Sequence, residues 1–141
     1  MTAKEYLSQA AVLKRRIEEV EYRIEQIETE MSSPKGVRYD KPMIQSSPTS
    51  DSLAYYVARL QNEKEKKQKL KDDYLDMYHK LECQINCIMP ELYCSILTRV
   101  YLQHKTLVVV SKELNYSYVQ MCRLHGFALL TFARTYPDII S

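Results

Sequence analysis

At 141 residues the chain is long enough for one modest domain, or for a small domain carried on a helical arm, which excludes a large multidomain enzyme. Its 20 basic and 18 acidic side chains give a net charge of +2, so the composition provides no general attraction to nucleic acid or to acidic membranes. Any contact with nucleic acid must be local, and the small basic excess lies in residues 84–141, which carry five basic and three acidic side chains.

The N-terminal sequence and the cysteines bear on where the protein resides. Met1 is followed by a polar stretch, and no segment approaches the ~18 apolar residues of a membrane span. We expect a cytoplasmic protein that makes no membrane contact. The cysteines fit no disulfide framework of a small secreted domain and have apolar neighbours, so buried, reduced thiols are expected at Cys83, Cys87, Cys94 and Cys122.

Residues 2–31 have the pattern of a long helix. Thr2 and Glu5 are spaced as a capping box, in which each side chain satisfies a free backbone N–H group at the helix start. Apolar side chains then recur at alternating steps of four and three residues, at Tyr6, Ala10, Leu13, Ile17, Val20, Ile24, Ile27 and Met31. This stripe is too narrow for the wall of a globular core, so the helix is expected to pair with another helix.

Residues 32–51 interrupt the helical pattern. The segment SSPKGVRYDKPMIQSSPTSD holds three of the five prolines and one of the two glycines, so it cannot continue either neighbouring helix. It is long for a simple connection, which leaves two alternatives, a disordered segment or a docked functional segment. Docking is favoured by the apolar residues Val37, Tyr39, Met43 and Ile44.

A second long helix is predicted over about 51–88. Its apolar seam comprises Leu53, Val57, Leu60, Tyr74, Tyr78, Leu81, Ile85 and Ile88. Lys64, Lys67 and Lys71 interrupt this seam, which therefore either shifts through Leu70 or leaves its partner. Because one chain must double back, the two long helices are expected to form an antiparallel hairpin.

Pro90 marks the next boundary, because proline is favoured in the first turn of a helix and disfavoured within one. A third helix is predicted after it, with a buried face formed by Leu92, Ile96, Leu97, Val100 and Tyr101. Residues 103–106 break this pattern. Thr106 is placed to cap the following helix, which begins at Leu107.

The stretch LVVVSKELNYSYVQMCRLHG, residues 107–126, has the spacing of a helix-turn-helix. Such a motif needs a small residue where its helices cross and a residue that tolerates left-handed backbone at the turn, and Ser111 and Asn115 meet these needs. Ser117 can cap the second helix, whose inward side carries Met121, Leu124, Ala128, Leu129 and Phe132. An ordinary helical hairpin is the alternative interpretation of this spacing.

Several segments together resemble a known family. They are KTLVVVSKELNYSYVQMCRLHGFAL, the preceding ILTRVYLQ, the N-terminal MTAKEYLSQA and the central GVRYDKPMIQSSP. They resemble the small prophage-encoded transcriptional regulators of Gram-positive hosts, the ArpU/RinA-like regulators, whose C-terminal part is similar to region 4 of bacterial sigma factors. The resemblance covers nearly the whole chain and implies sequence-specific binding to double-stranded promoter DNA and control of late phage genes. Family members usually carry Glu in place of Val108 and Val109, and a basic residue in place of Val119.

The second helix of such a motif enters the major groove. Its outward positions near the start are Tyr118, Val119, Gln120, Cys122 and Arg123. Gln120 can pair with adenine and Arg123 with guanine or a phosphate, while Val119 can contact a thymine methyl group. Phosphate contacts are expected from Ser117, Tyr118, Lys105 and Lys112. Each of these residues also has an alternative interpretation without DNA. Gln120 and Arg123 would then belong to a solvated helix face, and Tyr118 would be a packed aromatic ring. His125 is expected to pack against the core or to cap a helix.

No pattern in the sequence carries enzyme chemistry. It has no phosphate-cradling glycine loop, no nucleophile elbow and no paired-carboxylate cleft, so we expect no catalytic residues. The cysteines and histidines lack the spacing of a zinc knuckle, so neither a metal nor another cofactor is expected.

The sequence therefore predicts an all-α protein. A long antiparallel, coiled-coil-like hairpin is expected at 1–89, with its irregular loop at 32–51, followed by a sigma region 4-like helix-turn-helix at 90–141. The hairpin is expected to mediate homodimerisation or contact with host RNA polymerase. Two other functions stay open on these grounds, a DNA-packaging component resembling a small terminase subunit and a coiled-coil protein adaptor.

Overall fold

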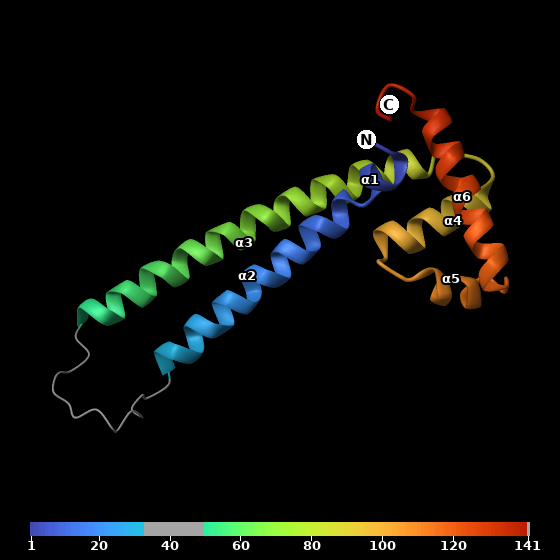
Figure 1. Ribbon diagram of the computed structural model, residues 1–141. Coiled ribbons are helices and arrows are strands. Elements are labelled where there is room, and N and C mark those ends of the chain that lie inside the picture. The colour runs from blue at the N-terminus through green and yellow to red at the C-terminus, as the bar shows by residue number, and fades with distance from the viewer. Residues whose placement is uncertain (33–49, 141) are drawn as a thin grey trace. The chain divides into compact units, whose positions relative to one another are not determined.

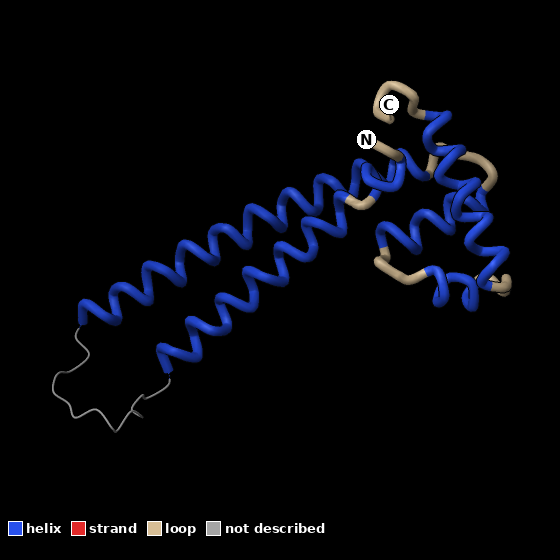
Figure 2. Tube along the Cα trace, in the orientation of Figure 1, coloured by secondary structure: helices blue, strands red, loops and turns tan. Residues whose placement is uncertain are grey.

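The computed structural model describes residues 1–32 and 50–140 (Figure 1). Its elements in chain order are α1 (Ala3–Leu7), α2 (Gln9–Ser32), α3 (Ser50–Ile85), α4 (Glu91–Leu97), the π-helical turn η2 (Thr98–Leu102), α5 (Leu107–Glu113) and α6 (Tyr118–Thr135). The described residues form helices and no strand, so the predicted all-α fold class is confirmed (Figure 2). The irregular segment predicted at 32–51 lies, apart from its ends, outside the described residues.

The chain divides into two compact units. The globular unit comprises residues 1–14 and 73–141, and the two-helix unit comprises residues 15–72. Residues from both ends of the chain thus share one unit, so the unit boundaries do not coincide with the domain boundary expected after residue 89. The division into domains at 1–89 and 90–141 stays a prediction.

The N-terminal helix begins as predicted and is interrupted early. The capping box is present, because Thr2 Oγ1 accepts a hydrogen bond from the Glu5 N–H at 3.2 Å and Glu5 Oε2 accepts one from the Thr2 N–H at 3.0 Å. The single helix predicted over 2–31 is instead divided at Ser8 into α1 and α2. The Ser8 hydroxyl donates to the Lys4 carbonyl at 2.7 Å, a local contact by which serine competes with helical backbone bonds.

Within the two-helix unit, α2 and α3 lie side by side and run in opposite directions (Figures 1 and 2). The predicted stripe of α2 faces inward here, with buried side chains at Ile17, Val20, Ile24 and Ile27. From α3 the contact face comes through Tyr56, Leu60, Glu63, Lys67 and Leu70, which are buried or half-buried. Of the two courses left open for the seam, it takes the shift through Leu70.

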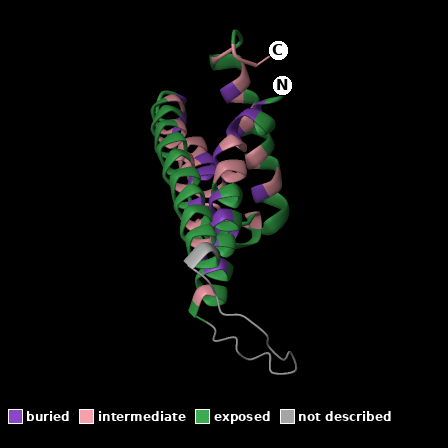
Figure 3. Ribbon diagram, turned by 90° about the vertical axis from the view of Figure 1, so that its left-hand side faces the viewer, coloured by how far each residue is buried: buried purple, intermediate pink, exposed green. Residues whose placement is uncertain are grey.

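The start of the predicted α3 seam is wrong. Val57 is 50% exposed because the four-and-three spacing that leads back from Leu70 passes through Glu63 and Leu60 to Tyr56; Leu53, near the start of α3, falls on this spacing but is 55% exposed. A carboxylate therefore occupies a seam position. Exposed and buried residues alternate along the long helices accordingly (Figure 3).

Glu63 is held in the seam by cations on both helices. Its carboxylate accepts from Arg23 Nε at 3.2 Å and from Lys66 Nζ at 3.4 Å, and a second ion pair joins Lys67 to Glu21 at 3.3 Å. Burial by itself would raise the pKa of the Glu63 carboxyl, but the hydrogen bonds from Arg23 and Lys66 outweigh it, so the pKa is lowered. The pairs fix one register between α2 and α3, since a shift along the seam would separate them.

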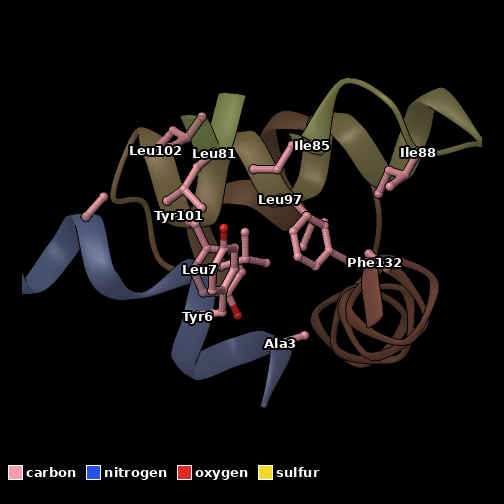
Figure 4. Packing of buried hydrophobic residues seen from close by; sticks show 12 residues of the cluster. Ala3, Tyr6, Leu7, Leu81, Ile85, Ile88, Leu97, Tyr101, Leu102 and Phe132 are labelled. Carbon is pink, nitrogen blue, oxygen red and sulfur yellow. The ribbon is translucent and has the colours of Figure 1, made fainter. Parts of the chain in front are cut away.

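The core of the globular unit gathers side chains that are distant in sequence. It contains Ala3, Tyr6, Leu7, Ala10, Leu81, Ile85, Ile88, Leu97, Tyr101, Leu102, Ala128 and Phe132. In Figure 4 the Phe132 ring points from α6 toward the side chains of the other helices, and its centroid lies 6.0 Å from that of Tyr6. The core thereby joins α1, the start of α2, the end of α3, α4, η2 and α6.

Gln84, near the end of α3, holds two tyrosines from opposite ends of the chain. Tyr6 Oη donates to Gln84 Oε1 at 2.8 Å, and Tyr136 Oη donates to the Gln84 carbonyl at 2.8 Å. Beside Tyr136, the half-buried Ile139 and Ile140 pack against the same core. These contacts tie the segment after α6 to α3.

The third helix widens before it ends. The helix predicted after Pro90 is present as α4, but residues 98–102 form a π turn in which the Gln103 N–H bonds to the Thr98 carbonyl at 2.9 Å. The extra residue in this turn lets the adjacent Tyr101 and Leu102 both enter the main core, while Ile96 packs in a second cluster under α5 and α6. The sequence did not predict this turn.

Candidate nucleic-acid interface

Helix α5 begins and packs as its sequence predicts. Thr106 Oγ1 accepts a hydrogen bond from the Val109 N–H at 3.3 Å and caps the first turn. Val110 and Ser111 are buried, and the Ser111 hydroxyl is satisfied by donating to the Val108 carbonyl at 2.7 Å. A small side chain at position 111 thus lies on the packed side of α5.

The connection between α5 and α6 depends on left-handed backbone. Asn115 has a φ of 63°, and the Tyr116 N–H reaches back to the Ser111 carbonyl at 2.9 Å. Asparagine is among the non-glycine residues that best tolerate this conformation, because its short polar side chain offsets part of the steric cost. The turn at Asn115 is as predicted.

A reciprocal cap fixes the start of α6. Ser117 Oγ accepts from the Gln120 N–H at 3.1 Å, and Gln120 Oε1 accepts from the Ser117 N–H at 3.2 Å. The cap on Ser117 was predicted, but the return contact was not, although the Ser-x-x-Gln spacing signals it. Gln120 therefore has a structural role in addition to the proposed DNA-reading role.

A small cluster sets α5 and α6 against α4. Its fully buried members are Ile96, Val110 and Met121, and partly buried side chains surround it at Leu92, Val100, Leu107, Leu114, Tyr116 and Leu124. Of the five positions predicted for the inward side of α6, Met121, Ala128 and Phe132 are buried while Leu124 and Leu129 are half-buried. The face of α6 opposite this side is left to solvent.

Of the five outward positions predicted on α6, four are exposed to solvent and one, Cys122, is half-buried. Tyr118, Val119, Gln120 and Arg123 are exposed on one turn and a half of α6, with Tyr118 at 52% and Val119 at 59%. Cys122 is half-buried, and its hydrogen bond with Tyr118 raises the pKa of the phenol. Cys122 is therefore less outward than predicted, because it lies toward the flank of α6 that borders the packed face.

The two lysines predicted to bind phosphate differ in their surroundings. Lys105 Nζ lies 2.8 Å from Glu113 Oε2, and the same carboxylate binds the Arg99 guanidinium, whereas Lys112 is exposed. Hydrogen bonds from Lys105 and Arg99 lower the pKa of the Glu113 carboxyl. This ion cluster joins η2, the loop before α5 and α5 itself, and neither Arg99 nor Glu113 was predicted from the sequence.

His125 packs on the inward flank of α6. Its Nε2 lies 2.8 Å from Tyr101 Oη, and the two rings are stacked with centroids 5.7 Å apart. Burial raises the pKa of Tyr101 to about 12, and burial with the nearby Lys4 ammonium lowers the pKa of His125. The expected packing role of His125 agrees with this environment.

The expectation that all four cysteines are buried is wrong. Cys83 and Cys87 are exposed, because the buried positions of the last turns of α3 are Leu81 and Ile85, and Cys94 and Cys122 are half-buried. All four thiols are free. Among the described residues, no group of three or more His, Cys, Asp or Glu side chains is placed to hold a metal ion.

Within the described ranges, 1–32 and 50–140, no helix is both long enough and apolar enough to cross a bilayer. Comparisons with protein-family profiles, with curated proteins and with solved structures find no match for this chain.

Proposed function

We propose that this protein is a phage or prophage transcriptional regulator that binds promoter DNA through a helix-turn-helix formed by α5 and α6. The observation that carries the proposal is the connection at Asn115. Two capped helices meet there through a single left-handed residue, and the start of the second helix leaves its outer face exposed. This is the arrangement by which a second helix can enter a major groove while the first crosses above it.

The side chains on that exposed face suit base recognition. Arg123 supplies a guanidinium that can pair with the two acceptors of a guanine, and Val119 supplies a methyl surface for thymine. Gln120 Oε1 is used by the cap, so in this proposal Gln120 positions α6 and can donate from its amide nitrogen. Reading of sequence then rests chiefly on Arg123.

Local charge favours an anionic partner at this surface. From Tyr118 to Thr135 α6 contains no acidic residue, and Lys112 projects from α5 as an exposed cation. Phosphate contacts from Lys112 and the Tyr118 hydroxyl would set the position of the module on the duplex. Lys105 is a weaker candidate for this role, because Glu113 already neutralises it.

The two-helix unit is the proposed site of subunit or polymerase contact. In this proposal α2 and α3 form the long antiparallel hairpin, and a second copy of the chain or host RNA polymerase covers its outer apolar side chains. Leu53 and Val57 support this role, since they lie one turn apart on α3 and are about half exposed. A regulator with two DNA-binding modules would read paired half-sites.

Selection of bound sequences from a random DNA pool at two salt concentrations tests the proposal. We expect wild-type protein to recover one motif that persists at the higher salt, and Arg123→Ala to lose roughly tenfold or more of the preference at one base pair. Arg134→Ala is the matched control, because Arg134 is an exposed arginine of the same helix three turns away. Recovery of unselected DNA by the wild type, or an unchanged motif with Arg123→Ala, would contradict the assignment.

A further inference from the structure

The C-terminal half of α6 exposes large apolar side chains beyond the proposed DNA-reading face. Phe127 is 53% exposed and Leu130 is 47% exposed, and both lie on the side of the helix opposite the buried Ala128 and Phe132. Leaving a phenylalanine and a leucine half in water costs free energy that burial against a partner would recover. This surface is separate from the turn at Asn115.

Four residues on this side form the outline of a hole for a helix side chain. Arg123, Gly126, Phe127 and Leu130 stand at positions i, i+3, i+4 and i+7, the four corners that receive one knob in knobs-into-holes packing, and we name them the outer hole. Gly126 leaves one corner without a side chain, and a Cβ added there would meet no atom within 4 Å. The outer hole is therefore open to a large apolar side chain.

The charged residues near the outer hole indicate which kind of partner could bind there. The charged residues of α6 are Arg123 at one corner and Arg134 one turn beyond Leu130, and the helix has no acidic residue. Two copies of α6 packed on each other would bring these arginines together without a carboxylate to pair them, which disfavours self-association. A partner helix with acidic residues beside an apolar stripe would cover Phe127 and Leu130 and would also pair with the two arginines.

We propose that the outer hole docks an acidic amphipathic helix of another protein. One large apolar side chain of that helix fills the space over Gly126, between Phe127 and Leu130, and its flanking carboxylates pair with Arg123 and Arg134. The contact is a helix laid against a helix face and is small, so it forms a weak, reversible complex. This role is additional to DNA binding, but both use Arg123, so the acidic helix and DNA would compete for that side chain.

Two synthetic peptides test the proposal with the full chain. Each is an amphipathic helix of about four turns with leucines at i, i+4 and i+7, one flanked by glutamates and the other by lysines at the same positions. Fluorescence anisotropy should detect binding of the glutamate peptide only, weakening as salt rises. In Phe127→Ser/Leu130→Ser its affinity should fall roughly tenfold or more, and Arg134→Glu should shift preference toward the lysine peptide.

The controls separate this surface from the rest of the module. Val108→Ala/Val109→Ala removes exposed apolar groups from α5, at 46% and 42% exposure, and should bind the glutamate peptide like wild type. Phe127→Ser/Leu130→Ser should keep wild-type helix content by circular dichroism and wild-type affinity for DNA. Loss of DNA binding in that folded variant would assign the surface to DNA and overturn the proposal.

Several other results would also overturn it. Equal binding of the two peptides, or no binding of the glutamate peptide up to about 1 mM, would remove the acidic helix as occupant. Self-association that disappears in Phe127→Ser/Leu130→Ser, measured by sedimentation, would make a second copy the occupant. Binding to anionic lipid vesicles that depends on Phe127 and Leu130, in a protein that ignores the glutamate peptide, would replace the protein partner with a membrane surface.

Discussion

The two units of the molecule bury their side chains in different ways. The globular unit surrounds residues such as Leu7, Leu81 and Phe132 so fully that none retains exposed surface. The two-helix unit buries a single row along α2 and places the charged Glu63 within the facing row of α3. Apolar burial is strong but has no direction, whereas an ion pair is weak and specifies a position.

The two units therefore differ in what holds their helices in place. In the globular unit, side chains from six elements enclose one another, so their shapes fix the arrangement together with the hydrogen bonds of Tyr6 and Tyr136 to Gln84. In the two-helix unit, a slide of one heptad would return similar apolar residues to the seam but would separate the pairs of Glu63 with Arg23 and Glu21 with Lys67. Mutations should therefore change the free energy of unfolding strongly in the globular unit. In the two-helix unit they should change it little and act mainly on the register of α2 and α3.

The largest effect is expected from Phe132→Ala. It removes a fully buried ring from the junction of α1, α4 and α6, and such truncations cost about 3–5 kcal/mol. Urea unfolding followed by circular dichroism measures the loss. Phe127→Ala is the matched control on the same helix, because its ring is 53% exposed, and it should cost less than about 1 kcal/mol. Equal losses in the two variants would show that the core is not organised around Phe132.

A smaller effect is expected from protonation of His125. The folded-state pKa is lowered below the ordinary value of 6.5 by burial and by Lys4, so between the two pKa values the unfolded chain binds more protons. Stability should be full above about pH 6.5, fall as the pH decreases through that range, and level off below the folded-state pKa. Urea midpoints measured from pH 8 to pH 5 test this expectation.

The control for this titration is His125→Gln. It removes the titrating group while keeping a polar side chain beside Tyr101, whose hydroxyl is 2.8 Å from His125 Nε2. The decrease in the urea midpoint between pH 8 and pH 5 should be smaller in this variant than in the wild type. A fall of the same size with and without His125 would place the titrating group elsewhere in the chain.

The smallest effect is expected from Glu63→Gln. The partners Arg23 and Lys66 are largely exposed, so loss of the charge should cost no more than about 1 kcal/mol at neutral pH. Because the pKa of Glu63 is lowered from 4.5, its contribution is present above that value and is lost as the pH falls through the folded-state pKa. Amide hydrogen exchange in α2 and α3 measures the change.

Glu65→Gln is the control for Glu63, since Glu65 is an exposed carboxylate two residues away on the same helix. Exchange in α2 and α3 should be faster in Glu63→Gln than in Glu65→Gln. Indistinguishable exchange in the two variants would mean that the seam charge does not hold the register.

Features governed by neighbouring residues could be predicted from the sequence. The capping box at Thr2, the caps at Thr106 and Ser117 and the left-handed Asn115 each depend on side chains within a few residues of the backbone they satisfy. The apolar stripe of α2 was visible for a similar reason, because its period is that of the helix itself.

Features that depend on distant partners could not be predicted in the same way. Glu63 occupies a seam position only because Arg23 meets it there, and apolar periodicity assigns no carboxylate to a seam. The π turn at residues 98–102 follows from the need to place both Tyr101 and Leu102 in the core, which no local pattern encodes. Exposure of Cys83 and Cys87 follows likewise from which side of α3 the other helices cover.

The two tyrosines held by Gln84 bear on the order in which the protein can fold during synthesis. Tyr6 leaves the ribosome long before the other anchored residue, Tyr136, and before the core residue Phe132. The paired helices at residues 15–72 are complete long before then. The two-helix unit can therefore form while α1 still lacks its core partners, and the globular unit can close only after α6 and Tyr136 have left the ribosome.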